Sequence, residues 1–341
     1  MGNRSLKICN DSENEYYNLY GQQLLTTNFA ISVLTFLVVF LISRANGISL
    51  FESKGNWITF FRAIANVTLV TFALSINLNS GRFDFSIGSV ALLGSVISST
   101  LCIQFGWSAP VMLVLSLLVG MFFGFLSGMV YVIVKLPPII VSLAMALLYE
   151  GLAFAITDGY GVSFVNNTEL VGFPSITNYL LITVAAVVIM IILFDHTEFG
   201  FNYKALLSGQ KVSVNTGIKE IGNTLGCYAI AGALMGIQGF ITSTNTGTIQ
   251  MSLNFGSIGA MFAAFLPMFI GGYIGRFAND KIGYLLGAVS MAFVSMAYVR
   301  LNLDSSVQQI ISALLLVGFL IYLNNEGKLI ELKMLAKRNK K

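Results

Sequence analysis

Two acidic residues fall inside or beside long apolar runs of the chain. Asp84 stands at the start of one run, two residues after Arg82, and Glu150 lies within another run, flanked by leucines. A charged group at the centre of a membrane costs about 2.5–3.5 kcal/mol on insertion scales, so an acid there is either functional or paired. Asp84 could instead pair with Arg82 or cap a helix that begins near Ile87. Both acids are candidate pathway residues, and a structural role stays open for each.

Three asparagines extend this polar set. Asn66 and Asn77 lie in the apolar run 57–78, and Asn79 follows it. Amide side chains in a membrane helix either face an aqueous path or form hydrogen bonds between helices. For a neutral polar solute, amide and hydroxyl groups are a suitable lining. We therefore expect these asparagines, with the two acids, to line a pathway, and interhelical hydrogen bonding is the alternative.

The sequence contains no motif that would support metal, redox or nucleotide chemistry. The chain has one histidine, His196, and three scattered cysteines (Cys9, Cys102 and Cys227), too few for a usual Cys/His metal site, and it has no C-x-x-C. It lacks the G-x-x-x-x-G-K-[ST] loop, so another chain would have to bind any ATP. His196 beside Asp195 could act as a base in a membrane-embedded enzyme, but an interfacial histidine with satisfied hydrogen bonds is the simpler interpretation. We expect no catalytic residue, cofactor, metal or nucleic-acid partner.

The composition predicts the elements that must hold these residues. Of 341 residues, 56% are hydrophobic and 10% are charged, and the mean hydropathy is +0.80. A soluble domain carries about 25% charged residues, so a soluble enzyme is excluded. Membrane helices need about 20 mostly apolar residues, and ten such runs occur: 24–43, 57–78, 85–105, 110–134, 138–157, 177–194, 220–243, 257–275, 282–300 and 306–323.

The sequence therefore predicts an all-α polytopic membrane protein with about ten transmembrane helices. Asn77, Asn79 and Gly81 interrupt the region 57–105, which leaves a re-entrant helix there open. Glycines recur at four-residue spacing, a pattern that lets helices approach closely and predicts tight packing or, alternatively, contacts that slide during transport. These glycines are Gly120, Gly124 and Gly128, with the pairs Gly222–Gly226, Gly232–Gly236, Gly271–Gly275 and Gly283–Gly287.

The cations predict the orientation. With both termini in the cytoplasm, 15 of the 19 Lys and Arg residues lie inside, as the positive-inside rule requires. The chain then divides into a cytoplasmic N-terminal segment 1–23, a transmembrane domain 24–323 and a basic cytoplasmic tail 324–341. The first apolar run is predicted to be a retained span rather than a cleaved signal. The net charge of +4 resides in the tail, which could contact anionic lipid headgroups.

The longest inside loop, 195–220, shows a short helical pattern. Tyr203, Leu206 and Leu207 share one face at i, i+3 and i+4, and Gly209 and Gly217 can end the helix on either side. Such an element is either an inert surface loop or a docking site for a soluble partner.

The same loop resembles that of a known family. Thr197-x-Phe199-Gly200, then Ala205, then Thr216-Gly217-Ile218 is similar to the cytoplasmic loop of ribose-type ABC importer permeases, which reads T-x-F-G, A and [ST]-G-I. Three further stretches agree in order between about residues 60 and 323. They are Gly81–Ser89 (similar to G-G-I-D-L-S-V-G-S), Lys135–Leu143 (similar to P-P-F-I-x-T-L), and the C-terminal stretch Gly271-Gly272, Gly283–Ala288 and Gln308–Ile310.

The chain departs from this family at several positions. Val212-Ser213 stand in place of an alanine pair, and Arg82 replaces the second glycine of G-G-I-D. The stretch Ile274–Lys281 is one residue shorter than its family counterpart, and Pro267 lies in an apparent insertion. The chain thus resembles a divergent member.

The resemblance implies a membrane subunit that forms the translocation pathway of an importer, without enzymatic activity of its own. It implies a cytoplasmic ATPase subunit, a second permease chain (identical or paralogous) and an external substrate-binding protein as partners, with membrane lipid around the bundle. The loop would be the coupling element, with Ala205, Ser208, Gly209 and Gly217 as contact or hinge positions. A monosaccharide is the expected solute, and nucleosides or branched-chain amino acids are alternatives. An ion-coupled secondary transporter that uses Asp84 or Glu150 is the alternative mechanism.

Overall fold

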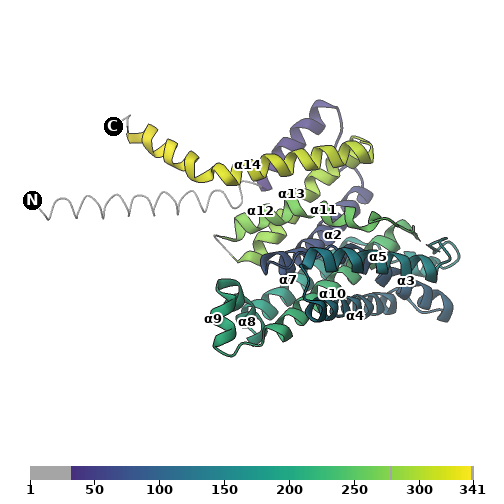
Figure 1. The fold of residues 1–341 in the computed structure, drawn as a ribbon. Coiled ribbons are helices and arrows are strands. Elements are labelled where there is room, and N and C mark those ends of the chain that lie inside the picture. The colour runs from purple at the N-terminus through teal and green to yellow at the C-terminus, as the bar shows by residue number, and fades with distance from the viewer. Residues whose placement is uncertain (1–31, 277–278, 339–341) are drawn as a thin grey trace, which may run out of the picture.

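The computed structural model describes residues 32–276 and 279–338, and in them almost every element is a helix (Figure 1). Within these described residues, eight helices are long and apolar enough to cross a membrane. They are α2 (Lys54–Asn79), α3 (Ile87–Phe105), α4 (Ala109–Val134), α5 (Pro138–Ile156), α7 (Ile176–Asp195), α10 (Glu220–Thr246), α13 (Asp280–Arg300) and α14 (Ser305–Arg338, with Ser305–Lys328 as its span). The fold class predicted from the sequence, an all-α polytopic membrane protein, is confirmed.

The other two predicted spans differ from full-length helices. Of the run 24–43, residues 24–31 lie outside the described residues, and the described part belongs to a short apolar helix, Ser32–Ala45. The prediction of one continuous helix over 257–275 is wrong. That run is divided into a 3₁₀ turn η1 (Gly256–Ile258), α11 (Gly259–Phe262) and α12 (Phe265–Gly275). The discontinuity lies here and not within 57–105, where α2 and α3 are separate helices of full membrane length.

Local sequence signals fix where several helices begin and end. Ser53 and Ser175 cap α2 and α7, because each hydroxyl accepts a hydrogen bond from the backbone N–H three residues on. Proline in the first turn starts α4 and α5, where a missing N–H costs nothing. Left-handed Gly106 and Gly247 end α3 and α10.

Glycines bring two helix pairs into close contact. Gly120 and Gly124 of α4 face Gly232 and Gly236 of α10, and a Cβ added to any of them would lie within 2.4 Å of a backbone oxygen. Gly283 of α13 meets α12 in the same way. The predicted tight packing is confirmed for these helices. Gly222 is an exception, since nothing lies within 4 Å of a Cβ built on it.

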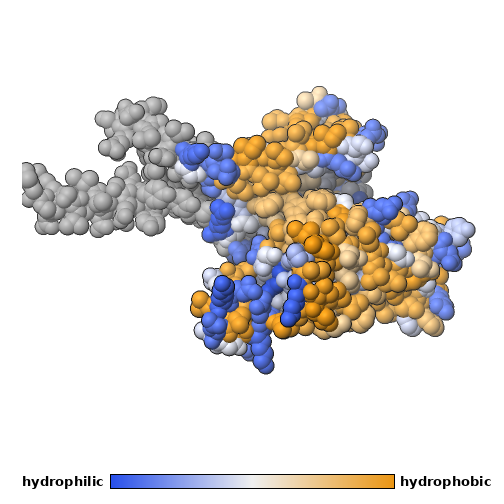
Figure 2. All heavy atoms as spheres, in the orientation of Figure 1, coloured by the Kyte–Doolittle hydropathy of each residue, from blue (hydrophilic) through white to orange (hydrophobic). Residues whose placement is uncertain are grey.

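The two ends of the bundle differ from its middle. One end carries α8 (Glu198–Ser208) and α9 (Gln210–Asn215). The other carries α6 (Thr168–Val171) and a two-stranded antiparallel sheet, β1 (Val162–Ser163) with β2 (Thr248–Ile249), in which Val162 pairs with Ile249. Figure 2 shows polar residues at both ends and a broad apolar surface between them. An apolar outer surface of this kind suits contact with lipid rather than water.

Candidate functional site

The segment between α7 and α10 begins with a tight corner. The Thr197 side chain accepts a hydrogen bond from the Gly200 N–H, which starts α8, and donates one to the Leu193 carbonyl. A Cβ on Gly200 would lie 2.3 Å from the Phe194 carbonyl oxygen, so this position requires glycine. The T-x-F-G stretch is thus the sequence that turns the chain from α7 into α8.

α8 lies against the end of α2. Tyr203 and Leu206 are buried, whereas Leu207, the third residue of the predicted apolar face, is exposed. The Tyr203 hydroxyl donates a hydrogen bond to the Ile76 carbonyl at 2.9 Å. Burial raises the pKa of Tyr203, so the phenol keeps its proton and its role as a donor. α8 is therefore anchored to the bundle through one face only.

Four apolar residues of α8 and α9 are exposed. We call Phe201, Leu207, Val212 and Val214 the α8–α9 patch; Val212, at 70%, is the most exposed of them. They lie at a polar end of the bundle, outside the membrane-length helices, where exposed apolar groups are candidates for a protein contact. Only Leu207 belonged to the apolar pattern read from the sequence, because α8 and α9 are two short helices that meet at Gly209 and share no single period.

The four predicted coupling residues lie in or beside this patch. The Ala205 carbonyl accepts a hydrogen bond from the Ser213 hydroxyl at 2.8 Å, which joins α8 to α9. Ser208 is exposed at the end of α8. Gly209 connects α8 to α9 in an extended conformation (φ 175°), and Gly217 adopts φ 97°, which favours glycine. The backbone thus requires glycine at Gly217 and leaves Gly209 without that constraint.

Arg82 ties this segment to the start of α3. Its guanidinium lies 3.3 Å from the Glu220 carboxylate at the start of α10, and the same oxygen accepts a hydrogen bond from Gln210 of α9 at 2.6 Å. The Arg82 side chain is 7% exposed. The local Arg82–Asp84 pair considered from the sequence is wrong, because Glu220, distant in sequence, provides the opposite charge.

Asp84 is buried among donors of its own turn. One carboxylate oxygen accepts hydrogen bonds from the Ser86 backbone N–H (2.8 Å) and hydroxyl (2.6 Å), and the other accepts one from Asn77 (3.3 Å). These contacts hold the turn that leads into α3, close to the capping role that the sequence offered as an alternative.

Glu150 holds the broken helix. One of its oxygens accepts a hydrogen bond from the Phe255 N–H (3.0 Å), and the other accepts from the Ser257 N–H (2.9 Å) and hydroxyl (2.6 Å). Glu150 lies about 18 Å along α5 from Pro138, at 1.5 Å per residue. A hydrocarbon core is about 30 Å thick. The 3₁₀ turn η1 therefore begins within the depth spanned by α5, about two thirds of the way along it from Pro138, and its N–H groups bind a carboxylate.

The three asparagines lie in different surroundings. Asn77 reaches Asp84, whereas Asn79 donates a hydrogen bond to the Tyr284 hydroxyl of α13 at 2.9 Å. The Oδ1 atoms of Asn66 and Asn77 are buried without a hydrogen-bond partner among the described residues. The five predicted pathway residues thus do not form one cluster.

A cavity of about 420 Å³ lies between α3, α10 and the chain that follows β2. Nine of its fifteen lining residues carry a hydroxyl or an amide, and none is charged. The lining consists of Gly88, Ala91, Leu92, Ser95, Gln238, Gly239, Thr242, Ser243, Thr246, Thr248, Ile249, Gln250, Ser252, Gly256 and Ser257. None of the five predicted pathway residues is among them, although Glu150 holds Ser257 in place.

The wall formed by α10 is a polar stripe. Gln238, Thr242 and Thr246 follow one another at four-residue intervals, and the Gln238 amide donates to the Thr242 hydroxyl at 3.0 Å. Thr242 and Thr246 are exposed although they lie on a membrane-length helix. Polar groups at such positions face water or protein rather than lipid. The four-residue spacing within an apolar run was the signal in the sequence that could have revealed this stripe.

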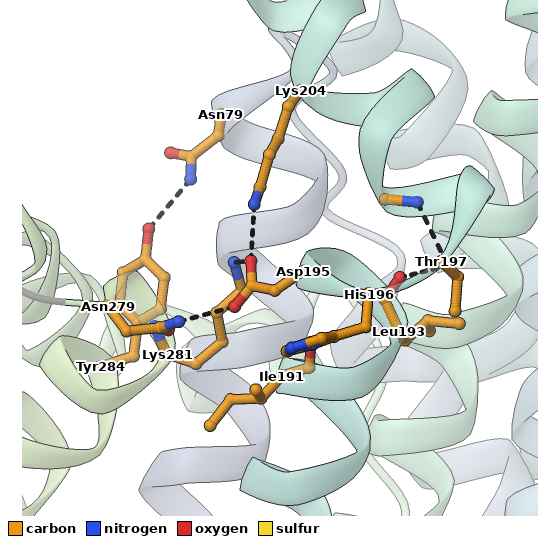
Figure 3. A network of polar contacts seen from close by, with 11 residues as sticks. Asn79, Ile191, Leu193, Asp195, His196, Thr197, Lys204, Asn279, Lys281 and Tyr284 are labelled. Atoms are coloured by element: carbon orange, nitrogen blue, oxygen red, sulfur yellow. Dashed lines mark hydrogen bonds and ion pairs between the residues drawn. The ribbon is translucent and has the colours of Figure 1, made fainter.

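Asp195, the last residue of α7, gathers three donors (Figure 3). Lys204 of α8 and Lys281 of α13 lie 2.6 and 3.0 Å from one carboxylate oxygen, and Asn279, which caps α13, donates to the other at 2.6 Å. His196 instead contacts the Ile191 carbonyl at 3.4 Å. Asp195 and His196 are thus not arranged as a catalytic pair. The described residues also contain no group of three potential metal ligands.

Comparison with known proteins places these features in context. Residues 58–323 match the family model described as "Branched-chain amino acid transport system / permease component". The autoinducer 2 import system permease protein of Photorhabdus luminescens is 24% identical, over 77% of this chain and 80% of the relative. A fructose import permease of Bifidobacterium longum is 23% identical (76% and 79% covered), and a ribose import permease of Haemophilus influenzae is 25% identical (78% and 84%). No solved structure matches significantly.

Proposed function

This chain belongs to the permease component family of branched-chain amino acid transport systems, and we propose that it forms the membrane pathway for a neutral polyhydroxylated solute, a monosaccharide. It is a multi-pass membrane subunit of an ABC importer and not an enzyme. The observation that carries the proposed solute class is the cavity between α3 and α10. Its size falls within the range of small-molecule sites.

The chemistry of the lining supports a sugar over an amino acid. An amino acid carries a carboxylate and an ammonium, each of which would need a charged or strongly polar partner when removed from water. The fifteen residues around the cavity offer hydroxyls, amides and glycine backbone, and no charge. Sugar hydroxyls both donate and accept hydrogen bonds and match such a lining. The relatives named for ribose and fructose point the same way.

The position of the cavity supports its place on the path. It adjoins the discontinuous helix that begins at η1, within the depth spanned by α5. Broken helices within the membrane place backbone polar groups where a solute can meet them. The exposed stripe on α10 then faces either the solute or a second permease chain, identical or paralogous, across the pathway. Asn77, Asn79, Asp84 and Glu150 shape this path through the turns and helices that they hold. Asn66, whose buried Oδ1 has no hydrogen-bond partner among the described residues, stays a candidate pathway residue.

The α8–α9 patch is the proposed docking surface for a cytoplasmic ATPase. This assignment puts the α8–α9 end of the bundle in the cytoplasm, and the proposed orientation has both termini on that side of the membrane. Ala205, Ser208, Gly209 and Gly217 would then be contact or hinge positions. The basic tail 324–341, whose described part extends α14 without a break, would lie beside anionic lipid headgroups. The end that carries β1 and β2 would face the external binding protein.

In this mechanism ATP-driven closure of the ATPase pair moves the docked segment as a rigid body. Helices joined to it tilt, and the cavity opens to one side of the membrane and then to the other. The ion-coupled alternative would require a titratable group poised to exchange its ion. The Asp84 and Glu150 carboxylates instead accept hydrogen bonds from residues of this chain, which favours a structural role for both.

The deciding experiment combines association and energetics. The protein is co-purified with the products of its neighbouring genes, and uptake of labelled D-ribose and D-fructose is measured in cells. We expect an ATPase to co-purify and uptake to follow ATP. The proposal fails if no ATPase co-purifies and an uncoupler abolishes uptake while ATP persists. A panel of sugars, nucleosides and branched-chain amino acids, scored by thermal stabilisation of the partner binding protein, then tests the solute class.

A further inference from the structure

The carboxylate of Asp195 joins three helices at the proposed cytoplasmic end. It belongs to α7, and it binds Lys204 of α8 together with Lys281 and Asn279 at the start of α13. Figure 3 shows these side chains converging from separate elements. α8 is already held against α2 by the hydrogen bond of Tyr203. A further connection from α8 to α13 is therefore not needed to hold α8 in place.

The two cations that bind Asp195 differ in exposure. The Lys281 side chain is 10% exposed and that of Asp195 is 14% exposed, whereas Lys204 is 47% exposed. Separating the inner pair would leave a buried ammonium without its counter-charge, which is strongly unfavourable. Asp195 and Lys281 therefore have to move together. Lys204 is more exposed to solvent, and through it α8 contacts the largely buried Asp195–Lys281 pair.

The start of α13 leads to the cavity through close packing. The Asn79–Tyr284 hydrogen bond lies one turn after Lys281, and a Cβ on Gly283 would lie 2.3 Å from the Gly271 carbonyl of α12. α12 and α13 are thus packed too closely to slide past one another. α12 continues back through α11 to η1, whose residues Gly256 and Ser257 line the cavity.

We propose that Asp195 is a positioning residue for transport, which passes the movement of α8 to the α12–α13 pair and so to the wall of the cavity formed by η1. The inference rests on the proposed function, because it requires an ATPase that moves α8. It adds a second route to the covalent one through α10. Asp195 contacts neither solute nor nucleotide in this role.

The test reports cavity movement directly. In a background without Cys9, Cys102 and Cys227, Ser252→Cys places a thiol in the cavity beside Gly256 of η1. Its reaction rate with a membrane-impermeant maleimide is measured in proteoliposomes of the permease–ATPase complex. Rates are compared without nucleotide and after trapping with ATP and vanadate. The variants are D195N, K281M and the double variant D195N/K281M, with K135M, an exposed cation that follows α4, as the matched control.

The double variant separates folding from coupling. It removes both charges, so no buried charge is left unpaired and the fold persists, whereas K281M or D195N alone can destabilise the protein. We expect trapping to change the labelling rate at least about fivefold in the parent and in K135M, the lower end of typical coupling between sites. In D195N/K281M we expect the same rate with and without trapping, while the ATPase stays bound.

Two results would overturn the inference. In one, the double variant shows the same trapping effect as the parent. In the other, it loses the ATPase, which would make Asp195 part of the docking surface and not of the transmission. A parent that binds no ATPase and shows no nucleotide effect would instead refute the proposed function, so the two failures are distinguishable.

Discussion

The backbone of Gly120 in α4 fills the space in which a side chain on Gly232 of α10 would lie, and the backbone of Gly232 does the same for Gly120. A Cβ on Gly120 would lie 2.3 Å from the Gly232 carbonyl oxygen, and a Cβ on Gly232 would lie 2.2 Å from that of Gly120. The contact is reciprocal, so the two backbones touch with no side chain between them. It places the α10 polar stripe at a fixed distance from α4.

The first prediction concerns this contact. Gly120→Ala or Gly232→Ala forces α4 and α10 apart, and overpacking of this kind costs about 1–3 kcal/mol. We expect a lower thermal midpoint of the detergent-solubilised protein, read by fluorescence-detected size exclusion. Gly222→Ala on the same α10 helix is the control. Nothing lies within 4 Å of its Cβ, so it should be neutral or slightly stabilising. Equal losses in all three variants would contradict the packing argument.

A second prediction addresses Glu150. In Glu150→Gln an NH₂ group replaces one acceptor oxygen and faces a donor, so a buried hydrogen bond is lost at a cost of about 1–3 kcal/mol. We expect reduced detergent stability and reduced uptake together, because η1 loses its anchor. Glu169→Gln, an exposed glutamate of α6, should change neither measurement. A stable Glu150→Gln protein that loses only its uptake would point to a role in solute or ion transfer instead.

The docking surface gives a third prediction. Val212→Glu puts a charge into the α8–α9 patch and should reduce ATPase co-purification at least about tenfold, as expected for a central interface residue. Val165→Glu is the matched control, since Val165 is 76% exposed near the opposite end of the bundle. Ala205→Arg and Gly217→Pro should also loosen the ATPase and abolish transport. Unchanged assembly in Val212→Glu would remove the patch as the docking site.

The fourth prediction concerns the solute cavity. Thr242→Val and Gln238→Leu remove hydrogen-bonding groups from the polar stripe, and each lost bond should lower uptake about fivefold, near 1 kcal/mol. Thr157→Val is the control, because Thr157, like Thr242, donates to the carbonyl four residues earlier in its own helix but does not line the cavity. Uptake that is equally sensitive to Thr157→Val would show a general stability effect.

The fifth prediction is that removing either partner of the Arg82–Glu220 ion pair destabilises the protein to a different extent. Glu220 is 32% exposed and can be hydrated, whereas the Arg82 side chain is buried. Glu220→Gln leaves that cation without its carboxylate and should therefore destabilise the protein more than Arg82→Met, by about 1–3 kcal/mol. Thermal unfolding of the two variants and their double variant measures the difference. Equal losses would mean that the ion pair contributes little to the fold.

Much of the fold could be predicted because bilayer-spanning helices are dictated by length and hydropathy. Eight of the predicted runs form helices of membrane length, and the glycine spacing indicated close packing without saying which helices it joins. The break before α12 escaped prediction although the run 257–275 holds a local signal for it. Pro267 lies in the first turn of α12 and has no N–H to bond to the Ala263 carbonyl. The contact that holds η1 was not predictable in this way, because Glu150 lies more than one hundred residues earlier in the chain and no local pattern records it.

Less of the candidate site than of the fold could be predicted from the sequence. The turn from α7 into α8 and the end of the loop 195–220 could be predicted because Thr197, Gly200 and Gly217 carry local backbone constraints that leave a trace in the sequence. The coupling role of that loop stays a prediction. The pathway was sought among acids and asparagines, whereas the cavity is lined by threonine, serine and glutamine. Hydroxyl side chains often bond to their own helix backbone, as Thr242 does. They are therefore common in any membrane helix, and only the fold distinguishes those that face a cavity.

α10 is one unbroken helix that begins at the Glu220 carboxylate beside the coupling segment and ends with the threonines of the cavity wall. At 1.5 Å per residue it is about 40 Å long, so a tilt of about 5° displaces its far end by about 3.5 Å. That displacement is comparable to the width of a water molecule and breaks no hydrogen bond within the helix. A helix of this length would turn a small angular movement at the ATPase into a change in the width of the cavity at its far end.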